Sequence, residues 1–160
     1  MAKEKFPVTQ AVRALKDQKA DFTLHLYKFQ EKGGTSVAAK ELGVDEHHVI
    51  KTLVMEDEGG NPFLVLMHGD REVSTKTLAR TKGVRTVTPC TPEVAHKHTG
   101  YLVGGISPFG TRRPLKVYAE ASIFDLPRIY INAGKKGLLA EISPAQLKEI
   151  LKPIPVSVAL

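Results

Sequence analysis

The sequence has little of what several classes of protein depend on. Of its 160 residues, one is a cysteine (Cys90), none is a tryptophan, and 6% are aromatic. A single cysteine excludes an internal disulfide framework and is typical of a reducing compartment. With so few aromatic residues, an extended base-stacking surface is not expected.

Long hydrophobic runs are also absent. The longest, such as FLVLM at residues 63–67, are too short to span a bilayer. The opening decapeptide MAKEKFPVTQ has no apolar stretch of the kind found in a secretory signal. We therefore predict a cytoplasmic protein with no membrane partner, most simply a single domain over residues 1–160.

Positive charge is in excess, because 23 lysines and arginines against 17 acidic residues give a net charge of +6. Such a balance suits a polyanionic partner, since lysine and arginine bind phosphates. It is equally compatible with a small basic protein that binds no nucleic acid. No predicted helix carries clustered basic residues that could face one DNA groove, so DNA is not an expected partner.

Hydrophobic periodicity predicts helices interspersed among hairpin strands. The helices are expected after the caps Thr9, Ser74, Thr91 and Ser143 and over residues 36–42, with Gly43, Gly83 and Gly100 as C-terminal stops and Gln146 completing a capping box. Strands are expected near residues 21–29, 49–55, 62–67, 85–88, 115–121, 128–134 and 138–143, with a short one ending at Val73. This order predicts an α+β fold, with a mixed, mostly antiparallel sheet that curls toward a barrel and is surrounded by helices.

Lys51 occupies an unusual place for a lysine. In the predicted strand VIKTLVM, alternate residues lie on opposite faces, so Lys51 lies on one face and Thr52 on the other. All other residues on both faces are apolar. The ammonium must therefore pair, extend from the end of the strand, or lose its charge. The alternative is an edge-strand lysine that discourages aggregation.

The glycine-rich stretch TGYLVGGISPFG, residues 99–110, fits no regular element. Gly104 and Gly105 permit positive φ angles and a close approach of the backbone, and consecutive free N–H groups form an anion-binding nest or an oxyanion hole. Pro108 favours an extended Ser107. The alternative is a tight crossover that needs glycine for packing alone.

Other catalytic motifs are not supported. GISPF has Phe109 where a nucleophile elbow needs its second glycine, and no Gly-Lys-Ser/Thr closes a P-loop. The histidine pairs at 47–48 and 96–98 lack metal-ligand spacing, so surface histidines are expected. Nothing near Cys90 indicates an activated thiolate. We predict no metal and no cofactor, but a site that binds an ester or acyl group and stabilises its oxyanion.

Three segments together resemble a known family. VIKTLV at residues 49–54, TGYLVGGISPFG at 99–110 and YINAGKKGLLAEI at 130–142 resemble the YbaK/EbsC family, free-standing relatives of the editing domain in bacterial prolyl-tRNA synthetases. The resemblance extends from the helix near Thr9 to the helix near Leu147. It implies an aminoacyl-tRNA deacylase that clears mischarged tRNA, with aminoacyl-tRNA as substrate and prolyl-tRNA synthetase as a partner.

The resemblance also assigns residues. It implies catalytic roles for Lys51 and Gly104, and we expect substrate contacts from Tyr27, Thr52, Tyr101, Gly105, Ser107, Asn132 and Gly134. In the cysteine-specific members the substrate's own thiol attacks the carbonyl and leaves as a thiolactone, so no protein nucleophile is required.

Three positions depart from the cysteine-specific pattern. This chain has Gly34-Thr35 where those members carry a phenylalanine, Leu139 where they carry an acidic residue, and Asn132 where they carry serine. Cysteine on tRNA(Pro) is therefore the first expectation and another small amino acid such as alanine the second. A non-catalytic module that binds tRNA or a synthetase is the alternative of a different class.

Overall fold

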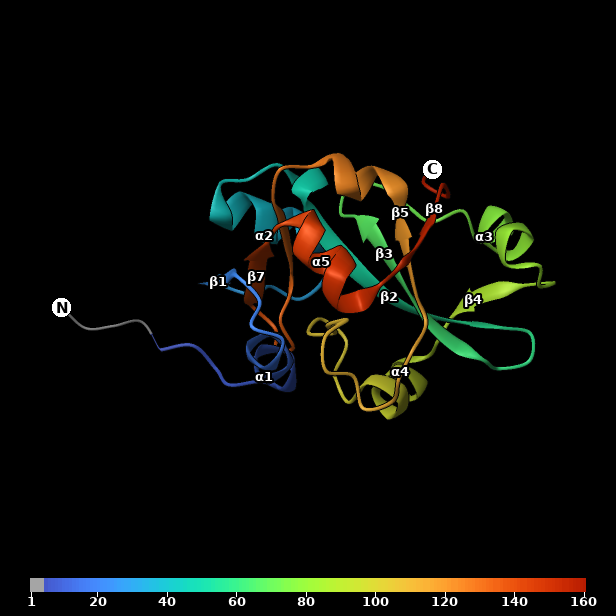
Figure 1. Ribbon diagram of the computed structural model, residues 1–160, viewed down its shortest axis with the longest axis horizontal. Helices are drawn as coiled ribbons and strands as arrows, with labels where there is room; N and C mark the ends of the chain where they lie inside the picture. Colours follow the sequence, from blue (N-terminus) through green and yellow to red (C-terminus); the bar gives the residue numbers. More distant parts are fainter. Residues whose placement is uncertain (1–4) are drawn as a thin grey trace.

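A computed structural model describes residues 5–160, in which helices pack around one mixed β-sheet (Figure 1). The helices are α1 (Gln10–Asp17), α2 (Gly34–Leu42), α3 (Thr75–Lys82), α4 (Pro92–Thr99) and α5 (Pro144–Leu151), with short 3-10 helices η1 (Glu46–His48) and η2 (Ala121–Asp125). The strands are β1 (Phe22–Leu26), β2 (Val49–Asp57), β3 (Pro62–His68), β4 (Val87–Pro89), β5 (Val117–Glu120), β6 (Ile129–Asn132), β7 (Leu138–Ile142) and β8 (Ile154–Val156). The predicted α+β fold class is confirmed.

The predicted helix boundaries follow from capping chemistry. The four predicted cap hydroxyls each accept a hydrogen bond from a backbone N–H of the first turn: Thr9, Ser74, Thr91 and Ser143. Gly43, Gly83 and Gly100 end their helices in the left-handed conformation, as predicted. Only one of the two hydrogen bonds of the predicted capping box at α5 forms. The Gln146 side chain accepts from the Asp21 N–H (3.1 Å) instead of from the N–H of its own helix cap.

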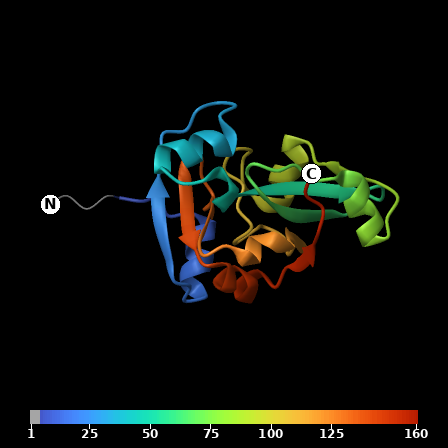
Figure 2. The same ribbon diagram turned by 90° about the horizontal axis from the view of Figure 1, so that it is seen from above.

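The sheet has the order β1-β7-β6-β2-β3-β5-β8, with β4 paired to β2. Pairing is antiparallel between β1 and β7, β6 and β7, β2 and β3, and β2 and β4, and parallel in the other three pairs. Figure 2 shows β1 and β7 running crosswise to β2 and β3, so the sheet curls strongly along its length. Strand β2 lies in the interior of the sheet, but at Lys51 it has a partner only on the β3 side, because its pairing with β6 ends at Ile50 and its pairing with β4 begins at Met55. Lys51 therefore lies at a local edge of the sheet, as the alternative interpretation has it.

The C-terminal segment, for which the sequence leaves open an edge strand or an unpaired tail, extends the sheet as an edge strand. Strand β8 pairs in parallel with β5, and Val73 forms only an isolated bridge with Ala159 instead of the predicted short strand. No helix in residues 5–160 is long and apolar enough to cross a membrane.

Hydrophobic side chains fill both faces of the central strands. Along β3, Leu64 and Leu66 belong to the main core with α1 and α5, while Phe63, Val65 and Met67 pack with α3. A third cluster joins α2 to β2 and β7 through Ala38, Val49 and Leu139. A strand buried on both faces reads as a continuous apolar run, as FLVLM does. This packing holds β2 rigidly beneath the site described next.

Candidate functional site

A cavity of about 720 Å³ opens over β2. Its walls come from the segment between β1 and α2, the start of α2, the end of β4, the glycine-rich stretch and the end of β6. Prominent lining residues are Tyr27, Phe29, Thr35, Lys51, Thr52, Glu72, Cys90, Val103, Gly104, Asn132 and Leu139. The volume lies within the range of about 300–1,000 Å³ that is usual for small-ligand pockets.

The cavity brings together five of the nine predicted site residues. Tyr27, Lys51, Thr52, Gly104 and Asn132 line it, although up to 105 positions separate them in the chain (132 − 27 = 105). The other four, which are Tyr101, Gly105, Ser107 and Gly134, are not among the residues that line it. The two residues predicted to be catalytic therefore share one cavity, and the remaining four lie outside its lining.

The floor of the cavity exists because β2 changes partner along its length. On one side β2 pairs with β6 only at Val49 and Ile50, and then with β4 only from Met55 onward. The intervening residues of β2 have no strand beside them on that side in the described chain. A gap in the sheet therefore lies where Lys51 and Thr52 line the cavity.

Lys51 is held at the cavity by one weak contact. Its Nζ lies 3.2 Å from Oε1 of Glu72, and the two side chains are 20% and 80% exposed. An ion pair with one partner in water typically contributes about 0–1 kcal/mol. Of the two alternatives that the sequence left for a charged lysine, pairing is observed.

Gly104 closes the cavity opposite β2. Its φ of +94° is in the region that favours glycine, and a Cβ placed there would lie 3.2 Å from both Lys136 Cε and Phe29 Cζ. Its carbonyl accepts a hydrogen bond from Asn132 Nδ2 at 3.2 Å. Asn132 thus fixes Gly104 against the turn that follows β6, and it acts as a positioning residue as well as lining the cavity.

The predicted nest of consecutive free N–H groups is smaller than expected. The Gly105 N–H already donates to the Leu102 carbonyl at 2.8 Å. A Cβ on Gly105 would lie 2.9 Å from the backbone N of Lys136, so this glycine is required for close packing. Of the two, only the Gly104 N–H is without a protein acceptor in residues 5–160.

The other predicted residues that lie outside the lining hold the glycine-rich stretch in its conformation through hydrogen bonds and close packing. The Tyr101 hydroxyl donates to the Phe109 carbonyl at 2.5 Å, and burial raises the pKa of Tyr101 to about 12. Ser107 is fully buried, and its hydroxyl accepts from the Phe109 N–H. Gly134 lies where a Cβ would come within 2.9 Å of the Tyr101 ring. These contacts are internal to the protein, and the substrate contacts expected of these residues stay a prediction.

Two wall residues escaped the sequence analysis. Phe29 stacks beneath Lys136, whose Nζ lies 5.0 Å from the ring centroid, and Glu72 pairs with Lys51. Phe29 follows Tyr27 by two positions, so alternation in the strand predicted over residues 21–29 could have placed Phe29 on the same face as Tyr27, which the resemblance had assigned to the site. An aromatic wall is therefore present, although Gly34-Thr35 stands where a phenylalanine was expected.

Cys90 lines the cavity without being activated. Burial, with smaller effects from the charge of Glu56 and a hydrogen bond to it, raises the pKa of the Cys90 thiol to about 11. At neutral pH this cysteine is a protonated thiol, which is a weak nucleophile. Tyr27 is likewise neutral, because burial raises the pKa of its phenol above the usual value. The described cavity lining includes no histidine that could serve as a base.

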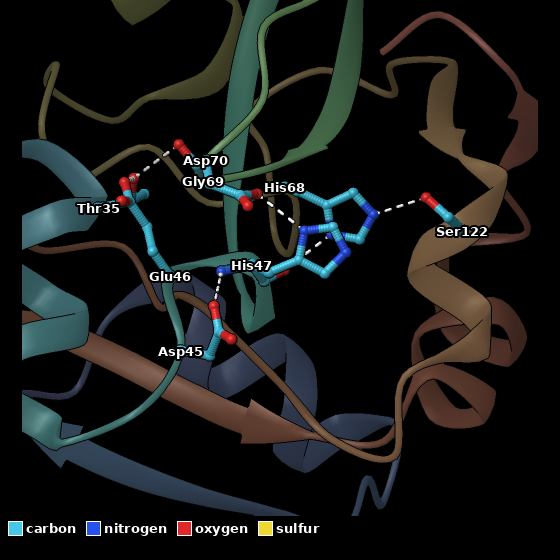
Figure 3. A network of polar contacts seen from close by, with 8 residues as sticks. All are labelled: Thr35, Asp45, Glu46, His47, His68, Gly69, Asp70 and Ser122. Atoms are coloured by element: carbon cyan, nitrogen blue, oxygen red, sulfur yellow. Dashed lines mark hydrogen bonds and ion pairs between the residues drawn. The ribbon is translucent and has the colours of Figure 1, made fainter. Parts of the chain in front are cut away.

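A polar network next to the cavity anchors the wall at Thr35 (Figure 3). The Thr35 hydroxyl donates to Glu46 Oε2 at 2.7 Å and also approaches the Gly69 carbonyl. Behind it, His47 binds Asp70 at 2.8 Å and stacks on His68 with a centroid separation of 3.7 Å. The network fixes the start of α2 against the end of β3.

The histidines do not form a metal site. No group of three or more His, Cys, Asp or Glu side chains suited to a metal occurs within the described part of the chain. The prediction that both histidine pairs lie at the surface is wrong for His98, which is 8% exposed. Burial, together with the neighbouring Arg113, lowers the pKa of His98, so its ring is neutral and packs inside the fold.

Comparisons with known proteins agree with this geometry. The family model for the aminoacyl-tRNA editing domain matches residues 31–150. The chain is 27% identical over 146 residues to the Enterococcus faecalis protein named "Putative Cys-tRNA(Pro)/Cys-tRNA(Cys) deacylase EbsC", covering 90% of this chain and 89% of that one. It is 29% identical over 114 residues to the proline–tRNA ligase of Levilactobacillus brevis, covering 69% of this chain but only 20% of that enzyme.

The fold has also been solved in a similar protein. A crystal structure described as "a putative trans-editing enzyme for prolyl tRNA synthetase" superposes with a TM-score of 0.83 at 22% identity, covering 97% of this chain and 99% of that one. The likeness in fold and the family match over three quarters of the chain (120 of 160 residues) point the same way. The chain belongs to the aminoacyl-tRNA editing domain family.

Proposed function

We propose that this protein is an aminoacyl-tRNA deacylase that removes a mischarged small amino acid from tRNA(Pro), with cysteine favoured and alanine next. The observation that carries the proposal is the shared cavity of Lys51 and Gly104 in a member of the editing family. The relative named as a Cys-tRNA deacylase supports cysteine, since it aligns over most of both chains.

The cavity offers positioning and electrostatics but no nucleophile. Lys51 is the charged group suited to contact the 3′ end of the tRNA, and the Gly104 N–H is the donor suited to the ester carbonyl. The protonated Cys90 thiol and the absence of histidine from the described lining disfavour attack by the protein itself. We infer that the nucleophile comes from the substrate or from water.

For a cysteinyl ester the proposed reaction is a cyclisation. The substrate sulfur attacks its own carbonyl carbon, a C–S bond forms and the ester C–O bond breaks. The thiol proton passes to the 3′ oxygen of the tRNA, so the products are a thiolactone and an uncharged tRNA. For an alanyl ester, water attacks instead and the free amino acid is released. Holding the reacting groups in line accounts for much of the acceleration in either case.

The lining is compatible with small side chains. Leu139 and Val49 contribute apolar surface, and the only acidic groups in the lining are Glu31 and Glu72, which pair with Lys136 and Lys51. Leu139 stands at one departure from the cysteine-specific pattern and is 3% exposed. Cysteine and alanine differ by one sulfur atom, and an apolar wall separates side chains that differ by a single group of about methylene size by only about 10- to 200-fold. Discrimination of cysteine from alanine therefore has to be measured.

The test is deacylation of Cys-tRNA(Pro) and Ala-tRNA(Pro), assayed side by side with product identification. We expect rapid loss of at least one ester, with a thiolactone from the cysteinyl ester and free alanine from the alanyl ester. Mass spectrometry of the released product separates cyclisation from hydrolysis. Loss of neither ester would favour a non-catalytic module that binds tRNA or a synthetase, and would contradict the proposal.

A further inference from the structure

Thr52 carries a buried polar atom for which the protein supplies no partner. Its Oγ1 is inaccessible to solvent and has no hydrogen-bond partner in the described residues, and it is the only buried side-chain oxygen or nitrogen there of which this is true. An unpaired buried hydroxyl is destabilising by about 1–3 kcal/mol. Thr52 also lines the cavity, so this unpaired hydroxyl lies in the wall of the candidate site.

The main chain of Thr52 is also unpaired, which follows from the alternation of a strand. The Val49 carbonyl accepts from the Gly69 N–H (2.7 Å) on the β3 side, and the Val54 carbonyl accepts from the Cys90 N–H (2.9 Å) on the β4 side. Successive residues of a strand direct their N–H and C=O groups to opposite sides. Thr52, two residues from Val54, therefore directs both groups away from β3.

On that side the sheet is interrupted. The pairing of β2 with β6 ends at Ile50, and the pairing with β4 begins at Met55. No other hydrogen bond within residues 5–160 engages the Thr52 main chain. One residue of β2 thus presents a free N–H and a free C=O toward the gap, in the arrangement that an antiparallel partner residue would pair with.

We propose that the aminoacyl group of the substrate fills this gap as a strand of one residue. Its ammonium donates to the Thr52 carbonyl. Its ester carbonyl accepts from the Thr52 N–H with one lone pair, which leaves the second lone pair for the Gly104 N–H. An α-aminoacyl ester carries these two groups on one edge, as a strand residue does, and a hydrogen-bonded antiparallel pair exchanges both bonds. This inference rests on the proposed function and specifies how its substrate is recognised.

The pairing has a consequence for substrate class. Recognition through the main chain requires the α-ammonium and is independent of the amino acid side chain. Selection among amino acids is then left to walls such as Leu139 and Phe29. An acyl group that lacks the ammonium is expected to bind poorly even if it is smaller.

The first test uses the native protein and RNA acceptor stems whose acyl group is attached through a stable amide. We expect the stem carrying alanine to bind about tenfold more tightly than the stem carrying propionate, since the two differ by one charge-assisted hydrogen bond. Equal binding of the two stems would overturn the proposal.

The second test removes only the N–H of residue 52, by incorporating the α-hydroxy analogue of threonine. We expect the alanyl stem to bind about tenfold more weakly. The matched control is the α-hydroxy analogue of methionine at Met55, whose N–H is directed toward β3. The control is expected to lose stability without losing affinity in the folded protein. A similar loss of affinity in both variants, or in neither, contradicts the pairing.

Thr52→Val tests the hydroxyl separately and keeps the shape of the side chain. Because the hydroxyl is unpaired in the free protein, we expect the variant to be at least as stable as the native protein. Since the proposed pairing uses only the main chain of residue 52, we also expect it to bind the alanyl stem as tightly as the native protein does. If the native protein turns over no mischarged tRNA, the proposed function fails. If it turns over tRNA and the loss of the N–H of residue 52 has no effect on binding, only the one-residue strand fails.

Discussion

Replacing Lys51 by alanine is expected to lower kcat/KM for mischarged tRNA by about 100- to 1,000-fold while the fold persists. A preorganised charge that acts on the transition state typically contributes an effect of this size. The same change removes an ion pair whose partner Glu72 is 80% exposed, together with the largely buried stem of the lysine, so the free energy of unfolding should fall by about 2 kcal/mol, most of it from lost packing. Deacylation rates and chemical denaturation of the two proteins check both parts.

Two further variants separate charge from shape at this position. Lys51→Met keeps most of the stem and removes the charge, so it should be nearly as inactive as the alanine variant. Glu72→Gln removes the partner of Lys51 and should leave activity within a few-fold, since Glu72 is 80% exposed. An unfolded Lys51→Ala protein, or an active Lys51→Met protein, would show that Lys51 serves the fold.

Gly104→Ala is expected to reduce kcat/KM by about 100-fold. The φ of +94° is unfavourable for alanine, and the new methyl would lie 3.2 Å from Phe29 and Lys136, so the stretch or these two side chains must shift. A displacement of about 1 Å at a site that works by positioning can itself reduce the rate about 100-fold. Deacylation kinetics measure the effect.

Gly60→Ala is the matched control for backbone strain. Gly60 has a φ of +74° in the β2–β3 turn, and a Cβ there would meet nothing within 4 Å. Both variants should lose about 1–3 kcal/mol of stability from the left-handed conformation. Only Gly104→Ala should lose activity, and an equal loss in both would mean that strain alone explains the effect.

Local chemistry accounts for what could be predicted from the sequence. Cap hydroxyls such as Thr9 and stops such as Gly43 determine helix ends through contacts a few residues away. The hairpin of β2 and β3 likewise follows from alternation and a turn containing glycine. The resemblance to the YbaK/EbsC family was sufficient to place Lys51 and Gly104 in one predicted site, although they are far apart in the chain.

What could not be predicted depends on tertiary contacts. Alternation shows which face Thr52 occupies but not which strands lie beside it, so the gap between β6 and β4 had no sequence signal. The two glycines at 104 and 105 look equivalent in sequence, yet Gly105 packs against the backbone of Lys136 while Gly104 faces the cavity. Tyr101 and Ser107 lie in the most specific motif because the glycine-rich stretch needs internal hydrogen bonds to hold its shape.

The central claim is that the cavity over β2 deacylates mischarged tRNA in preference to correctly charged tRNA. The most direct measurement follows the loss of amino acid from Cys-tRNA(Pro), Ala-tRNA(Pro) and Pro-tRNA(Pro) with the native protein and without it. The account predicts that the protein accelerates loss of the cysteinyl or the alanyl ester and spares the prolyl ester. Loss of all three esters at their spontaneous rates would contradict it.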